Sequence, residues 1–137
     1  MRISQKLEYA CRALSQLAKR HDKKSITRLD ELAQREAVSA NFLVQILNDL
    51  RRAGLVDSKR GKEGGYHLAK DPSAITLKEI VDAIDPALLV FSVSSEGDSG
   101  PGVAQAWKSL AEDFQKNLHT ITLDQLATTQ GDSMFYI

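Results

Sequence analysis

A group of polar side chains within one short segment could recognise the edges of nucleic-acid bases. Asn41, Gln45 and Asn48 carry amides, which can form paired hydrogen bonds with N6 and N7 of adenine. The hydroxyl of Ser39 can serve several bases, and Val44 could contact the methyl group of thymine. The same residues could also form an ordinary solvated helix face, so their meaning depends on the elements that position them.

The apolar residues around this group predict a helix that turns it outward. The core stripe of that helix has the spacing i, i+3, i+4 and i+7 and consists of Leu43, Ile46, Leu47 and Leu50. Ser39 is a favourable N-cap, and Gly54 suits the positive φ expected just after the helix. A shorter amphipathic helix precedes it, and we expect Thr27 and Asp30 to form its capping box. Two short helices joined by a tight turn predict a helix-turn-helix.

A basic β-hairpin is predicted directly after these helices. Residues 55–60 and 66–69 have the character of strands around the glycine-rich turn GKEGG. Lys59, Arg60 and Lys62 lie at or near its tip. Like charges on a small exposed loop repel each other, so a polyanionic partner accounts for them better than a solvated turn does. Arg60 is the candidate for insertion into a narrow minor groove.

Charge is divided unevenly along the 137-residue chain, although its net charge is zero. Residues 1–70 hold 15 Lys and Arg against 8 Asp and Glu, a net +7, whereas residues 71–137 hold 3 against 10, a net −7. The basic half can neutralise phosphates, and the acidic half should stay away from them. Contacts to the phosphate backbone are expected from Arg2, Lys6, Arg51 and Arg52.

The remaining sequence predicts further helices and one irregular stretch. Residues 4–20 should form the first helix, and a short strand could follow at residues 25–27. Thr76 and Glu79 predict a capping box at the start of another helix. Residues 86–101 lose periodicity and are expected to form a flexible loop.

A longer helix is predicted from about residue 103 to about residue 119. Its apolar residues fall near a heptad spacing, which is typical of a helix that pairs with a partner helix, although packing on its own domain fits the spacing nearly as well. The expected homodimer interface consists of Val103, Trp107, Leu110, Phe114, Leu118 and Ile121. The predicted fold is mainly α with a small β-wing: a winged helix-turn-helix domain (1–85), the loop (86–101), and a dimerisation helix with a C-terminal segment (102–137).

The chain resembles the Rrf-two type transcriptional regulators over nearly its whole length. The resemblance is carried by MRISQKLEYACRAL, by SANFLVQILNDLRRAGLVDSKRGKEGGYHLAKDPSAITLKEIVDAID and by ITLDQL. It implies a winged-helix domain, a long dimerisation helix and a dimer on a partly palindromic operator. Matched by position, the family's base-reading residues fall on Asn41, Val44 and Gln45, and its wing arginine falls on Arg60. Val44 is a departure, because some members carry an acidic residue there that discriminates between types of site.

A second departure concerns iron. Members of this family that bind an iron–sulfur cluster carry three cysteines, with a nearby histidine or acidic ligand, in the stretch that corresponds to residues 86–105. Here that stretch contains neither Cys nor His, and Cys11 is the only thiol of the chain. Because such clusters need thiolate ligands, we expect no cluster and no other cofactor. His21, His67 and His119 lack metal-ligand spacing, so no metal site is expected.

The sequence favours a DNA-binding regulator over other classes of protein. No nucleophile–base pair or phosphate-binding glycine loop indicates an enzyme. No bilayer-spanning apolar run or secretory signal is recognised, and a single cysteine suits a reducing compartment, so a cytoplasmic protein is expected. We expect a homodimeric repressor that binds double-stranded DNA and responds to a small-molecule or protein effector. The alternative is a winged-helix adaptor that binds protein instead of DNA, against which the basic wing and the polar reading face count.

Overall fold

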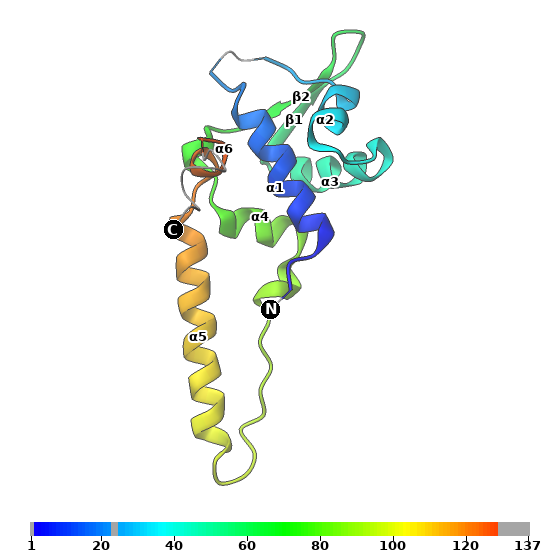
Figure 1. The fold of residues 1–137 in the computed structure, drawn as a ribbon. Coiled ribbons are helices and arrows are strands. Elements are labelled where there is room, and N and C mark those ends of the chain that lie inside the picture. The colour runs from blue at the N-terminus through cyan, green and yellow to red at the C-terminus, as the bar shows by residue number, and fades with distance from the viewer. Residues whose placement is uncertain (1, 23–24, 129–137) are drawn as a thin grey trace, which may run out of the picture.

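The computed structural model of the chain describes residues 2–22 and 25–128. A mainly helical body carries a small antiparallel sheet at one end, and a long helix projects away from the body at the other (Figure 1). No helix among the described residues is long and apolar enough to cross a membrane. In chain order the elements are α1 (Gln5–Ala18), α2 (Leu29–Glu36), α3 (Ala40–Arg52), β1 (Val56–Lys59), β2 (Gly65–Leu68), the 3-10 turn η1 (Pro72–Ala74), α4 (Leu77–Ile84), the 3-10 turn η2 (Pro86–Leu89), α5 (Gly100–Thr120) and α6 (Leu123–Thr128).

The core lies where α1, α3 and α4 pack together. Leu14, Leu47 and Ile80, one from each helix, are fully buried there. Each buried side chain of this size contributes about 1.5–3 kcal/mol relative to an exposed one. Leu123 of α6 joins the same core, and α6 packs against α1. After α5 the chain therefore returns to the body through α6.

Side-chain caps fix the starts of three helices, and the two at Ser39 and Thr76 are those that the sequence predicts. The Ser4 hydroxyl accepts a hydrogen bond from the Leu7 amide at 3.1 Å, and Ser39 accepts one from Phe42 at 3.2 Å. At α4 both hydrogen bonds of the Thr76–Glu79 capping box are present. Each cap satisfies amide groups that a helix leaves unpaired at its start, which is worth about 1 kcal/mol.

The capping box predicted for α2 is wrong. Its N-cap is Arg28, which makes no side-chain capping bond. Thr27 is buried and instead pairs through its backbone with Tyr66 of β2, with N···O distances of 2.9 and 2.8 Å. A single β-bridge therefore replaces the short strand expected at residues 25–27. It also connects the start of α2 to the sheet. Ala37, with a φ of +56°, reverses the chain between α2 and α3.

The wing is the antiparallel pair β1 and β2, with Val56 opposite Leu68 and Lys59 opposite Gly65. Its connection contains Gly61, whose φ of +108° strongly favours glycine. At Gly65 a Cβ atom would lie 2.4 Å from the carbonyl oxygen of Thr27, so a larger residue would force the sheet away from α2. The structure thus confirms both predictions: α2 and α3 form the helix-turn-helix, and β1 and β2 form the wing.

Candidate nucleic-acid interface

The predicted base-reading side chains lie on α3. Asn41 and Gln45 are exposed, whereas Val44 and Asn48 are half-buried. None of the three amide side chains has a hydrogen-bond partner within the described residues, so their donors and acceptors are available to a ligand. Ser39 is different, because its oxygen already caps α3, although its hydroxyl hydrogen can still be donated.

Packing on the opposite face of α3 holds this reading face outward. Leu43 and Leu50 are fully buried. At the N-terminal end of α3, the ring of Phe42 meets the ring of Tyr9 edge to face, with centroids 5.7 Å apart. Such aromatic pairs add about 0.5–1.5 kcal/mol to the burial of their area. The start of α3, where base contacts are expected, is therefore fixed against α1.

An acidic residue that the sequence analysis did not single out organises two of the predicted phosphate contacts. The carboxylate of Asp49 pairs with the Lys6 ammonium at 2.6 Å and also with the Arg52 guanidinium. These hydrogen bonds, with that from Lys6 first, lower the pKa of Asp49 below its ordinary value. Asp49 thus ties α1 to α3, and Lys6 and Arg52 present partly neutralised charges. The i,i+3 spacing of Asp49 and Arg52 on one helix is a pattern from which their ion pair could be predicted. No pattern in the sequence indicates that Lys6 pairs with Asp49.

The wing presents cations that no acidic side chain among the described residues neutralises. Lys59, Arg60 and Lys62 are exposed, and none of them forms an ion pair in the part of the chain that the structure describes. Arg51, at the end of α3, donates a hydrogen bond to the Ser58 hydroxyl of β1 at 3.2 Å. This bond links the reading helix to the wing, so both can approach one partner as a unit.

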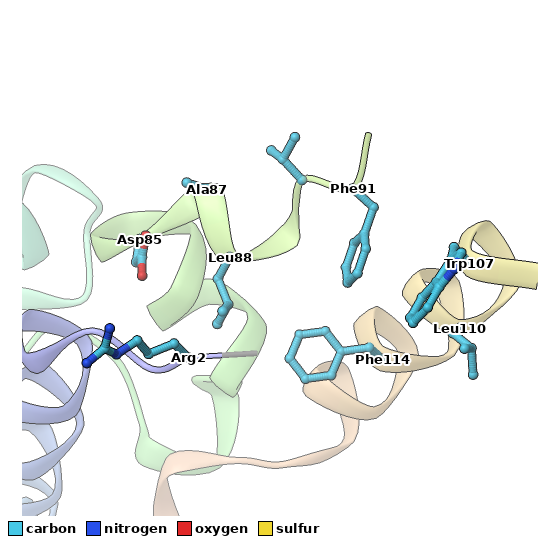
Figure 2. A pocket seen from close by; sticks show the side chains of 9 residues that line it. Arg2, Asp85, Ala87, Leu88, Phe91, Trp107, Leu110 and Phe114 are labelled. Atoms are coloured by element: carbon cyan, nitrogen blue, oxygen red, sulfur yellow. The ribbon is translucent and has the colours of Figure 1, made fainter. Parts of the chain in front are cut away.

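Arg2 lies elsewhere. Its side chain lines a pocket of about 530 Å³ between residues 85–91 and α5, together with Asp85 and apolar side chains. Figure 2 shows the rings of Phe91 and Phe114 directed toward each other across this pocket, with Arg2 and Asp85 toward the body. The structure therefore brings together the predicted DNA contacts of α3 and the wing, but it separates Arg2 from them.

The predicted dimer seam is divided along α5. Val103, Trp107 and Leu110 are 49%, 48% and 57% exposed, although all three are large apolar residues. Further along, Phe114 is half-buried against the core and Leu118 is buried within it. Ile121 caps the end of α5 and is half-buried. The apolar surface that the body leaves uncovered is therefore the N-terminal half of the helix.

Comparison with known proteins shows the family and the fold of the chain. Residues 3–129 match the Rrf2 family model, described as "Iron-dependent Transcriptional regulator". The chain belongs to the Rrf2 family. The HTH-type transcriptional regulator CymR of Bacillus subtilis is 35% identical over 141 residues, spanning 100% of both proteins. The solved structure of CymR, "the Global Cysteine Regulator of B. subtilis", has a TM-score of 0.84 at 32% identity and covers 95% of this chain and 99% of its own. T. potens IscR has a TM-score of 0.75 at 30% identity, covering 99% and 97%.

These matches establish an Rrf2-type, helix-turn-helix transcriptional regulator that binds DNA. They also confirm the mainly helical winged-helix fold with its long C-terminal helix. The family is one of transcriptional regulators and not of enzymes, as the sequence analysis expected.

The residues of this Rrf2 chain do not fit a thiolate-bound iron cluster, despite the family's description. Cys11 is the only thiol of the chain, and burial raises its pKa to about 11, which disfavours the thiolate that binds iron. No three His, Cys, Asp or Glu side chains among the described residues are grouped so that they could hold a metal ion. Protein purified without oxygen should accordingly show no visible absorption, and stoichiometric iron and sulfide would contradict this expectation.

Proposed function

We propose that this Rrf2-type regulator acts as a homodimer that represses transcription from a partly palindromic operator. The observation that carries the proposal is the set of amides on α3, beside cations on the wing, that have no hydrogen-bond or ion-pair partner among residues 2–22 and 25–128. In a winged helix-turn-helix, the second helix of the motif enters the major groove and its N-terminal residues reach the base edges. Asn41, Val44 and Gln45 would then read bases, and Arg60 would enter the adjacent minor groove.

The proposed dimer interface is the N-terminal half of α5, which the body leaves uncovered. Val103, Trp107 and Leu110 expose apolar area on one side of a helix that projects from the body (Figure 1). Their near-heptad spacing suits a second α5, because a two-fold contact covers the same patch on both chains. Phe91 also exposes its ring beside this face, which enlarges the apolar surface. Two copies would present two reading helices, as a palindromic operator requires.

An effector site is proposed in the pocket that shares Trp107 and Leu110 with that interface. Apolar walls with Arg2 and Asp85 at one end suit a small molecule that has an apolar part and a charged or polar end. Trp107 lines the same pocket and is the only tryptophan of the chain, so its emission should change when such a molecule binds. A candidate that leaves the emission unchanged is not the ligand of this pocket.

The proposed function is tested by selecting genomic fragments with the purified protein, then measuring affinity for the best fragment across a salt series. Selective binding to a partly palindromic site, with log K falling steeply against log salt, is expected of a dimer that reads DNA and neutralises phosphates. Repression is tested by placing that site across a promoter. A protein that prefers no fragment and binds weakly even at low salt would be the winged-helix adaptor instead.

Arg60→Ala should weaken operator binding roughly tenfold, equivalent to about 1.4 kcal/mol, because a charged contact in the minor groove is lost. The dimer should persist, since the wing and α5 lie at opposite ends of the molecule (Figure 1). Lys116→Ala removes an exposed cation from α5 and is the matched control. Equal affinity of Arg60→Ala and wild type in a shift assay would remove Arg60 from the interface.

A further inference from the structure

A cationic pocket lies between the start of α2, the end of α3 and the wing. It has a volume of about 460 Å³, and its wall includes the basic side chains Arg28, Arg51, Lys59 and Arg60. Arg51, Lys59 and Arg60 belong to the interface described above, whereas Arg28 is the N-cap residue directly before α2. Basic side chains from three separate parts of the fold therefore line one pocket.

Arg28 is fixed in this pocket by the wing itself. Its Nη1 donates a hydrogen bond to the backbone carbonyl oxygen of Lys62 at 2.9 Å, across 34 positions of sequence. The neighbouring Thr27–Tyr66 bridge holds the same two segments together through the backbone. An arginine has five N–H donors in a planar fork, so this bond leaves Nη2 able to bind an anion.

The charge balance of the pocket remains positive. Asp30 is the acidic residue in its wall, and its Oδ1 lies 3.6 Å from Nε of Arg28. The Asp30 side chain is 82% exposed, so solvent screens that pair strongly. One carboxylate set against four cations leaves an excess that favours a polyanion.

The position of the pocket matches the path of DNA past a winged helix. A protein with a helix in the major groove and a wing in the adjacent minor groove must straddle the phosphate backbone that separates the two grooves. The pocket lies between these two reading elements and has the cations that such a backbone attracts. We propose that Arg28 completes a seat for a DNA backbone phosphate here, binding the phosphate while it holds the wing turn in place. The proposal rests on the DNA-binding mode proposed above.

The test compares Arg28→Ala, Arg28→Lys and wild type on the selected operator and on random DNA, each across a salt series. Arg28→Ala should weaken binding to both DNAs by a similar factor, about three- to tenfold, and should make the slope of log K against log salt shallower by about 0.9. Arg28→Lys should restore most of the slope because it restores the charge. Arg35→Ala is the control, since Arg35 is an exposed arginine of α2, the helix that follows Arg28; it pairs with Glu31 and does not line the pocket.

Each outcome decides the role of Arg28. An unchanged slope in Arg28→Ala would overturn the proposal, even if affinity fell, because a purely structural role would not remove a phosphate contact. A slope that falls equally in Arg35→Ala would also overturn it, since the effect would then come from net charge alone. The wild-type measurement distinguishes this from a failure of the proposed function. If wild-type protein shows no salt-dependent selective binding, the proposed function fails; if only Arg28→Ala keeps the wild-type slope, the failure is confined to Arg28.

Discussion

Leu110→Asp should convert the proposed dimer into a monomer. Leu110 is 57% exposed in the single chain and lies on the uncovered side of α5. Enclosing a carboxylate in an apolar contact without a partner costs several kcal/mol, so we expect the dissociation constant of the dimer to rise roughly 100-fold or more. Analytical ultracentrifugation at micromolar protein concentration measures this directly. A variant that still sediments as a full dimer would move the interface away from this half of α5.

Gln105→Asp is the matched control, because it adds the same charge to the same helix. Gln105 lies two positions from Trp107, on the side of α5 away from the apolar stripe, and is exposed. The dimer should survive this change. Trp107, 48% exposed in the single chain and the only tryptophan, provides a second measurement. Its emission should shift to shorter wavelength as wild-type protein is concentrated, and should not shift in Leu110→Asp.

Loss of the dimer should also reduce affinity for the operator. Two linked reading heads bind a two-part site with an avidity that exceeds either head alone by about 10²–10⁴. A monomeric variant should therefore lose affinity by a factor in this range for the full operator, but much less for an isolated half-site. Equal losses on both DNAs would show that the substitution damaged the winged helix-turn-helix of each protomer.

Local patterns in the sequence predicted much of the body. The Thr76–Glu79 capping box and the apolar stripe of α3 depend on residues within one or two turns, where spacing and geometry are directly linked. Gly54 likewise follows from the local need for positive φ at the end of a helix, and it has a φ of +79°. These local patterns also fix the bounds of α3 and the wing, the elements that carry the candidate interface.

Contacts between distant segments could not be read from the sequence. Thr27 had the right spacing to cap α2, but a β-bridge to Tyr66 uses it instead. The Lys6–Asp49 ion pair spans 43 positions. Leu118 fits the heptad seam as well as Trp107 does, yet it packs into the core of its own chain. Apolar spacing shows that a helix face is buried and does not show what buries it.

Gln45→Ala should cost about 1–3 kcal/mol on the operator, roughly a 5- to 150-fold loss of affinity, and little on random DNA. Gln45 is exposed on the reading face of α3, and its amide has no hydrogen-bond partner within the described residues, so the substitution breaks no side-chain hydrogen bond there. Gln105→Ala makes the same change on α5 and should leave both affinities unaltered. Competition shift assays with operator and random DNA measure the difference. Equal losses on the two DNAs would mean that Gln45 does not read sequence.

Gln45→Glu tests the same role through the identity of the base. An amide can both donate to N7 and accept from N6 of adenine, whereas a carboxylate only accepts and suits the N4 amino group of cytosine. If Gln45 reads an adenine, repeating the fragment selection with Gln45→Glu should change the preferred base at one position in each half-site from adenine to cytosine. The other positions should keep their preferences, because Asn41 and Arg60 are unchanged. An unaltered selected sequence would exclude Gln45 as a base-reading residue, whatever the loss of affinity.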